Sequence, residues 1–399
     1  MKRTALRWIA AASALAALGT IDAARRPRYG GDLRIEMRAA MRTLDPAEAP
    51  PDAAMLTQAV FETLVRLDDR GDPQPWLAVS WTHDAVRKCW VFTPRANVMM
   101  HNGTVWTPAP IEAPDDQPIE QILREMSRTR NAVVIRGADG SLTGTGPFKI
   151  AQWDADKSAK LVAHDGYWGG RPYLDSIDIR MGRDFSDQTA DLQLSKADVV
   201  ESQTARRPSG SPDEVLALEF DHRVPENVRE AVALSIDRAA IHKVILQGQG
   251  EVSGALLPRW LTGYSFLFPV ERDVARARQI AGTSAPLGFS YDVKDPVIKA
   301  VAQRIEVNVR EAGVVTRPAQ GSPDVRLIRF PVASRDPWVA LEEIASILKA
   351  PAAAAASPYE WERGLLDGFR VVPIVHVTKV WALSPRVKNW PRLADIWLE

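Results

Sequence analysis

Residues 29–46 read YGGDLRIEMRAAMRTLDP, and the interpretation of the fold starts from this stretch. The apolar side chains of Leu33, Ile35 and Met37 alternate with charged ones, as they do in a strand that buries one face. The alternation predicts a β-strand over residues 32–38. Turn-forming Gly30 and Gly31 precede this strand, and Pro46 lies beyond it.

Further along the chain, strand-like and helix-like patterns are interspersed. Residues 89–93, 148–153, 325–330, 371–377 and 380–383 have the composition of strands. Helical periodicity runs over 227–246, from Asp295-Pro296, which open a helix, to Gly313, and over 338–348. This mixture predicts an α/β architecture. The length of 399 residues indicates two or three domains, so more than one lobe is expected.

The composition excludes several classes of protein. Fifty Lys and Arg balance fifty Asp and Glu, so the surplus of positive charge that captures nucleic acid or anionic membranes is missing. Cys89 is the only cysteine, which rules out an internal disulfide and any multi-cysteine metal site. Cys89 lies in a predicted strand and is interpreted as an inert core thiol, not as a nucleophile.

The first 24 residues have the pattern of a secretory signal peptide. Lys2, Arg3 and Arg7 provide the positive segment, and the apolar run 9–18 follows it. This run is shorter than the roughly 20 residues that a membrane-spanning helix needs. A buried N-terminal helix is the alternative interpretation. The pattern predicts export and a periplasmic location.

A search for catalytic chemistry gives no positive result. None of the six histidines pairs with another at a metal-ligand spacing, and no Gly-x-Ser-x-Gly motif is present. Residues 144–147 (GTGP) begin like a phosphate loop but lack the Lys-Ser/Thr that would hold a nucleotide. We therefore predict no enzyme activity, no cofactor and no metal. An exported hydrolase remains an alternative, and it would need Ser, His and Asp side chains close together.

Several segments, taken in order, are similar to one known family. They are YGGDLR (29–34), RTLDP (42–46), VFETLVRL (60–67), PWLAVSW (75–81), MHNGT (100–104), GTGPF (144–148) and YWGG (167–170). Each is weak alone, but their order resembles that of family 5 extracellular solute-binding proteins. These are the dipeptide, oligopeptide and nickel receptors of ABC transporters.

The resemblance implies a two-lobed periplasmic binding protein fold of type II with an extra N-terminal subdomain. Lobe I would comprise 28–50, 143–220 and 370–399, the subdomain 51–142, and lobe II 221–369. The implied function is a periplasmic receptor for a peptide-like or small polar ligand. Closure of its cleft would deliver the ligand to a permease in the inner membrane.

Two segments, after Thr107 and after Leu348, are short for the family. This shortened variant leaves open a second function, as a binding protein that has lost import and acts as a scaffold or sensory partner.

The same resemblance gives candidate ligand-binding residues. Met37, Arg38 and Met41 follow the first strand, where relatives approach the ligand. Trp106 and Trp338 could face the cleft, with core packing as the equal alternative. Phe330 falls near a tryptophan of peptide-binding relatives, and Asp336 could replace the carboxylate that binds a peptide amine. Arg329 and Arg335 could face an anionic ligand, or simply be solvated.

Overall fold

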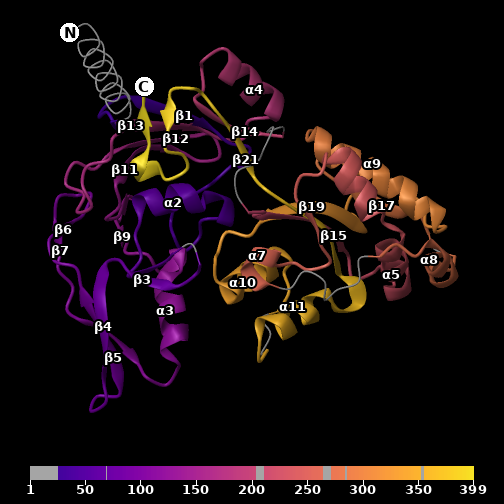
Figure 1. Ribbon diagram of the computed structural model, residues 1–399, viewed down its shortest axis with the longest axis horizontal. Helices are drawn as coiled ribbons and strands as arrows, with labels where there is room; N and C mark the ends of the chain where they lie inside the picture. The colour runs from indigo at the N-terminus through magenta and orange to yellow at the C-terminus, as the bar shows by residue number, and fades with distance from the viewer. Residues whose placement is uncertain (1–25, 69, 204–210, 264–270, 284, 352–354) are drawn as a thin grey trace, which may run out of the picture.

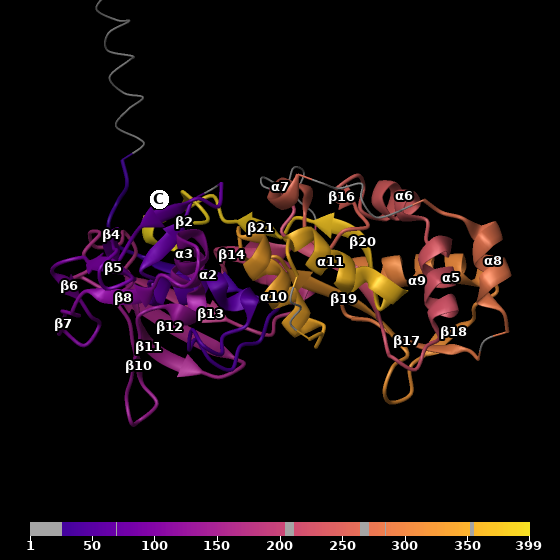
Figure 2. The ribbon, with the colours of Figure 1, turned by 90° about the horizontal axis from the view of Figure 1, so that it is seen from below.

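The computed structural model describes residues 26–399 except 69, 204–210, 264–270, 284 and 352–354. The predicted signal peptide, residues 1–24, lies outside the described residues. Two bodies stand side by side, and each is built around a six-stranded sheet (Figure 1). Seen from below, the molecule is elongated along the line that joins them (Figure 2).

The first sheet has three parallel strands at its centre, β13, β1 and β14. The predicted early strand is confirmed as β1, where Leu33 and Ile35 are fully buried. In sheet order the strands are β11 (Phe148–Asp154), β12 (Ser158–Ala163), β13 (Ser176–Arg180), β1 (Asp32–Glu36), β14 (Val199–Ser202) and β21 (Val380–Leu383). Helix α4 (Phe185–Gln193) packs on β14. Since parallel neighbours share a direction, the carboxyl ends of β1 and β14 meet at one edge of this sheet.

A smaller unit extends from the first body and holds its own apolar cluster around Leu77, Phe92 and Leu123. Its three-stranded sheet is β4 (Ala78–Asp84), β5 (Cys89–Pro94) and β8 (Ile111–Pro114). The paired short strands are β2 (Val65–Leu67) with β3 (Pro73–Pro75), β6 (Val98–Met99) with β7 (Val105–Trp106), and β9 (Ile135–Arg136) with β10 (Leu142–Thr143). Its helical segments, with those that link it to β1, are η2 (Pro51–Ala53), α2 (Ala54–Val60), α3 (Ile119–Ser127) and η3 (Thr129–Asn131).

The second body has a sheet that is covered by helices on both faces. Its strands, in order, are β16 (Glu251–Val252), β20 (Val371–Val377), β15 (Glu214–Phe220), β19 (Val325–Pro331), β17 (Leu287–Ser290) and β18 (Thr316–Pro318). Leu216 and Leu218 of β15 pack with α5 (Glu226–Ser235), α8 (Val274–Ala281) and α9 (Pro296–Glu311). Val215 and Ala217 point the other way, toward α10 (Pro337–Ile347) and α11 (Pro358–Leu366). The near-continuous apolar run of β15 follows from this burial on both faces.

The expected lobe ranges differ from the strand pairing at two places. Residues 214–220 and 371–377 were expected in the first lobe, but β15 and β20 pair with each other inside the second sheet. Each has apolar side chains on both faces, which only a sheet covered on both sides can bury. The chain crosses between the bodies at residues 378–379, between β20 and β21, and again between β14 and β15.

The helix expected over 227–246 is interrupted. Helix α5 ends at Ser235, and the Asp237 side chain accepts a hydrogen bond from Ala240 N and begins a new turn. The continuation is α6 (Arg238–Ala240) followed by a π-turn, η4 (Ile241–Ile245). An aspartate favours this helix-starting conformation because its side chain bonds the free amide groups of the first turn.

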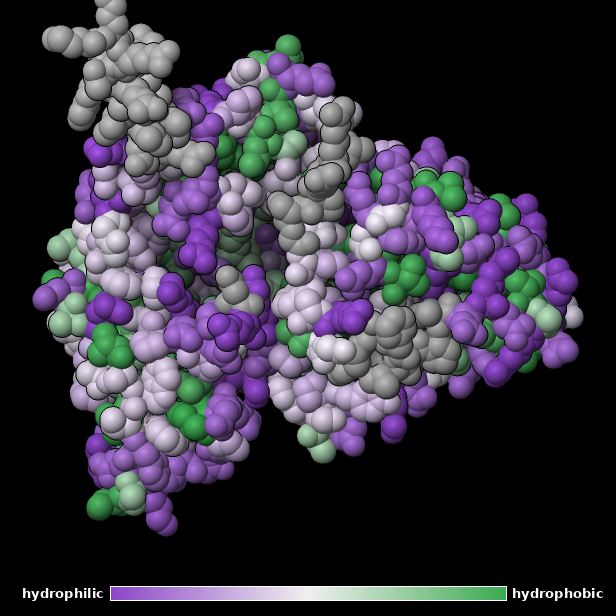
Figure 3. All heavy atoms as spheres, in the orientation of Figure 1, coloured by the Kyte–Doolittle hydropathy of each residue, from purple (hydrophilic) through white to green (hydrophobic). Residues whose placement is uncertain are grey.

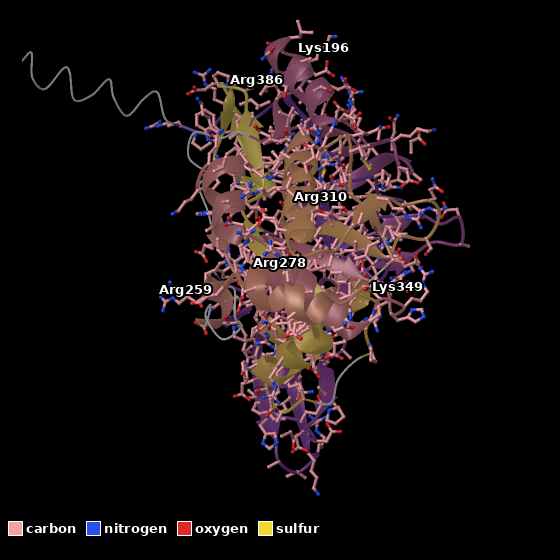
Figure 4. All side chains as sticks on the ribbon, turned by 90° about the vertical axis from the view of Figure 1, so that its right-hand side faces the viewer. Lys196, Arg259, Arg278, Arg310, Lys349 and Arg386 are labelled. Atoms are coloured by element: carbon pink, nitrogen blue, oxygen red, sulfur yellow. The ribbon has the colours of Figure 1, made fainter. Side chains whose placement is uncertain are left out.

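The remaining elements are α7 (Arg259–Thr262), η5 (Asp367–Phe369), β22 (Val387–Lys388), η6 (Leu393–Asp395) and β23 (Trp397–Leu398). Within the described part of the chain, no helix is both long and apolar enough to cross a membrane. Figure 4 labels six basic side chains on one side of the molecule. The labelled ones project from well-separated places: Lys196, Arg259, Arg278, Arg310, Lys349 and Arg386.

Candidate functional site

A cavity of about 270 Å³ lies between the two sheets. Figure 3 shows the surface hollowed between the two bodies. The first body contributes side chains from the carboxyl ends of β1 and β14 and from the start of α4. Ligands of open α/β sheets bind at such strand ends. The lining residues are Arg38, Ala39, Asp52, Phe185, Glu201, Ser202, Glu214, Asp292, Asp295, Ile298, Leu327, Arg329, Pro331, Lys379 and Val380.

Arg38 connects the two bodies across this cavity. Its guanidinium pairs with Asp292, and its Nη1 lies 3.2 Å from Asp295 Oδ2. The same guanidinium lies over the Phe185 ring, 4.5 Å from the ring centre. Two carboxylates and one aromatic face therefore surround a single cation, an arrangement that favours positive charge.

Asp295 is fully buried and is held rigidly at the start of α9. Its Oδ1 accepts hydrogen bonds from Val297 N at 2.9 Å and Ile298 N at 3.1 Å, so it caps the helix. Gln203 of the connection after β14 donates to the same oxygen at 2.6 Å. Oδ2 is left to face the cavity, toward Arg38.

Two further cations line the cavity, and both are paired. Arg329 Nε donates to Glu214 Oε2 at 2.7 Å, and Lys379 Nζ lies 2.9 Å from Glu201 Oε1 and 3.5 Å from Asp52. Burial lowers the pKa of each cation, but the surrounding carboxylates raise both pKa values above their ordinary levels. Both side chains are therefore charged at neutral pH.

The charges of the lining do not balance. Five carboxylates, those of Asp52, Glu201, Glu214, Asp292 and Asp295, face three cations. The cavity thus carries a formal surplus of two negative charges. Among the described residues, no group of three or more His, Cys, Asp or Glu side chains has the arrangement of a metal site.

A second set of ion pairs joins the small unit to the second body, outside the cavity. Arg124 on α3 pairs with Asp336 at 2.5 Å, and Glu342 on α10 pairs with Arg128 and, at 2.7 Å, with Arg130. Arg128 is nearly buried in this contact. The two bodies are therefore linked by charge both in the cavity and along the edge below it.

The structure separates the sequence-predicted ligand residues. Arg38 and Arg329 line the cavity. Met37 and Met41, which follow β1, and Phe330 of β19 are buried in apolar clusters and do not line it.

The other four candidates lie elsewhere. Trp106 is half-buried against the apolar cluster of the small unit. Trp338 packs on Trp361, with the two ring centres 6.0 Å apart. Asp336 caps α10, and Arg335 lies over Trp260 at 5.7 Å from the ring centre.

Sequence reasoning missed most of the cavity. Asp295 was interpreted only as a helix start before Pro296, and that interpretation is confirmed by the cap geometry. Asp292 carries no local signal, because it meets Arg38 only where the two bodies pack together. Glu201 accepts a hydrogen bond from Arg38 N, a contact that depends on the pairing of β14 with β1. The one available signal was the position of Glu201 at the end of a buried strand, where ligand groups gather in α/β folds.

Two sheet-centred bodies, an extra N-terminal unit and a polar cavity between the sheets define a periplasmic binding protein fold of type II. The expected fold class is confirmed by solved structures of this kind. One is a periplasmic binding protein, DppA, from Helicobacter pylori in complex with the peptide STSA. It superposes with a TM-score of 0.73 at 17% identity and covers 93% of this chain and 99% of that one. The murein tripeptide binding protein MppA from Escherichia coli gives a TM-score of 0.76 at 16% identity, and the superposition covers 93% of this chain and 99% of MppA.

The middle of the chain matches a family model. Residues 131–283 match the model of the bacterial extracellular solute-binding proteins, family 5, middle region. The expected resemblance to this family is thereby confirmed.

Relatives of known name are similar over part of their length. The dipeptide-binding protein of Escherichia coli is 24% identical over 207 residues, which cover 43% of this chain and 37% of that protein. The heme-binding protein A of Haemophilus influenzae is 27% identical over 206 residues, 45% and 38% of the two chains. The chain thus spans well under two thirds of these relatives. The nickel-binding periplasmic protein of Escherichia coli is 22% identical over 353 residues, 68% of this chain and 67% of that protein.

Proposed function

We propose that this protein is a solute-binding receptor of an ABC importer, which captures a small polar or peptide-like ligand between its two bodies. The observation that carries the proposal is the cavity of about 270 Å³ between the sheets, lined by charged groups from both. A ligand held there contacts both bodies at once. It therefore stabilises the closed arrangement over an open one, which is the requirement for ligand-driven closure.

The short crossing at residues 378–379 supports a hinge motion. Lys379 lies in this crossing and reaches both Glu201 and Asp52 in the cavity wall. Hinges are commonly a few residues at the ends of elements, and this crossing has that position. We further propose that the closed form docks on an inner-membrane permease, that the protein works in the periplasm after removal of residues 1–24, and that it is not an enzyme.

The size of the cavity favours a small ligand. Its volume of about 270 Å³ lies just below the range of roughly 300–1,000 Å³ that is typical of small-molecule sites. An extended oligopeptide would need a wider opening of the bodies than this structure has. A single amino-acid derivative, a very short peptide or a similar polar compound fits the proposal best.

The alternative, a binding protein that acts only as a scaffold or sensory partner, is supported by the short segments after Thr107 and Leu348. An intact polar cavity between two bodies argues against it, because a scaffold gains nothing from a site buried between lobes.

Small-angle X-ray scattering on the purified chain tests the proposal. The radius of gyration is measured with and without a panel of amino acids, di- and tripeptides, opines and metal chelates, together with the melting temperature. We expect at least one solute to compact the protein and raise its melting temperature. If the whole panel leaves both quantities unchanged, the receptor function is refuted.

A further inference from the structure

The setting of Arg38 has the chemistry of an occupied binding site. Its guanidinium lies between the carboxylates of Asp292 and Asp295 from the second body and the Phe185 ring from the first. Proteins hold cationic ligands in the same way, with acidic groups at the edge of the cation and an aromatic ring on its face. We propose that this pocket is a cation subsite of the cavity, and that Arg38 occupies it as a tethered substitute for the cationic group of the ligand. The proposal rests on the receptor function argued above.

The charge surplus of the cavity favours a cation over an anion. Arg38, Arg329 and Lys379 are each paired with carboxylates, and two negative charges remain in excess. An anionic ligand would have to compete with those carboxylates for every cation. A guanidinium or an amine competes for Asp292 with Arg38, and for Asp295 with Arg38 and with Arg329, whose Nη1 lies farther away, 3.8 Å from Asp295 Oδ2.

One acidic group of the subsite is built to stay in place. Asp295 is fully buried, and three donors hold its Oδ1. Its orientation therefore does not depend on Arg38. Arg38, in contrast, follows the end of β1 on a flexible side chain that is about one quarter exposed. The Asp295 carboxylate is therefore fixed, whereas Asp292 is 42% exposed and Arg38 is the part that can leave.

This asymmetry gives Arg38 a role in specificity. A ligand cation must displace it from Asp292 and Asp295, so the apparent affinity is lowered by the fraction of molecules in which Arg38 occupies the subsite. Neutral and anionic compounds gain nothing from that exchange. The nearby Lys294 is not a competing cation of the subsite, because it does not line the cavity and its Nζ pairs with Asp184 Oδ2 at 3.5 Å.

Isothermal titration calorimetry with three probes of similar length tests the proposal: butylguanidinium, pentanamide and glutarate. The variants are Arg38→Ala, which empties the subsite, and Arg42→Ala, whose side chain is 89% exposed and lies outside the cavity. We expect Arg38→Ala to bind butylguanidinium about tenfold more tightly than the wild type, because the tethered competitor is gone. The affinity for pentanamide and for glutarate should not increase in Arg38→Ala, and Arg42→Ala should bind all three probes with the affinity of the wild type.

The variant Arg38→Ala/Asp292→Asn should lose the gain for butylguanidinium, since one wall of the subsite is neutralised. If Arg38→Ala folds poorly, Arg38→Met removes the charge but keeps a long unbranched side chain, and it is expected to give the same result. The proposal is overturned if neither variant gains affinity for butylguanidinium, or if glutarate gains as much. Scattering separates this failure from that of the receptor function. If only neutral or anionic solutes compact the protein, the receptor function is retained and the cation subsite is rejected.

Discussion

The carboxylate of Glu62 is the most heavily bonded acidic group in the small unit, and its removal should be costly. It is almost fully buried between α2 and β2. Its two oxygens accept hydrogen bonds from four side chains: Trp76 Nε1 at 2.9 Å, Thr145 Oγ1 at 2.9 Å, Tyr167 OH at 2.8 Å and Trp168 Nε1 at 2.9 Å. Glu62→Ala therefore leaves four donors without their acceptor at one point.

The expected cost follows from those four donors. Each buried donor without a partner costs roughly 1–3 kcal/mol, so the low end of the range gives about 4 kcal/mol in the free energy of unfolding. Glu62→Gln keeps one acceptor oxygen but places an NH₂ group against donors, and it should lose about half as much, roughly 2 kcal/mol.

Urea unfolding followed by tryptophan fluorescence is the suitable assay, because Trp76 and Trp168 lie in the network. Glu48→Ala, at an exposed position on the surface, is the matched control and should change stability by no more than about 0.5 kcal/mol. If Glu62→Ala remained within about 1 kcal/mol of the wild type, the four hydrogen bonds would not be stabilising as argued.

Three further predictions concern backbone fit, pH and the hinge. Gly250→Ala should lower the free energy of unfolding by at least about 2 kcal/mol more than Gly248→Ala does, as measured by thermal or urea unfolding. Both glycines have positive φ, but only at Gly250 would the new Cβ lie 2.2 Å from His376 O. Burial raises the pKa of Glu343 to about 7, so the folded state keeps a proton that the unfolded chain releases near pH 4. Stability should therefore fall as the pH rises from about 4 to 7, and Glu343→Gln should flatten that slope; an unchanged slope would contradict the assignment. Lys379→Met should lower the free energy of unfolding by about 3 kcal/mol, because it leaves two carboxylates near the hinge unpaired, and equal stability in urea would reject this.

The sequence predicted the parts of the fold that depend on local pattern. β1, β5 and β20 were expected from apolar runs and alternation, and α9 from Asp295-Pro296 at its start. The sheet to which a strand belongs could not be predicted in the same way. A strand that is buried on both faces has the same apolar sequence pattern in either sheet. For this reason β15 and β20 were expected on the wrong side of the boundary between the two bodies.

The lining of the cavity was even harder to predict from local sequence pattern than sheet membership. Arg38 and Arg329 were recognised through the family resemblance, but their partners were not. Asp292 is 254 residues from Arg38, and no periodicity connects positions so far apart. Met37 and Met41 were expected in the same role as Arg38, yet they are fully buried in the core. These residues lie just beyond the end of β1, where the strand pattern no longer predicts which side chains face the core.

The position of Lys379 makes the hinge part of the cavity wall. Lys379, which carries the chain from one sheet to the other, also pairs with two acidic side chains that line the cavity, Glu201 and Asp52. A change in the charge of the cavity therefore acts directly on the segment about which the bodies would turn, without a relay through the core. Substitutions that alter ligand preference near Glu201 should for that reason also alter the resting angle between the bodies. In this protein, selectivity and mechanics would have to evolve together.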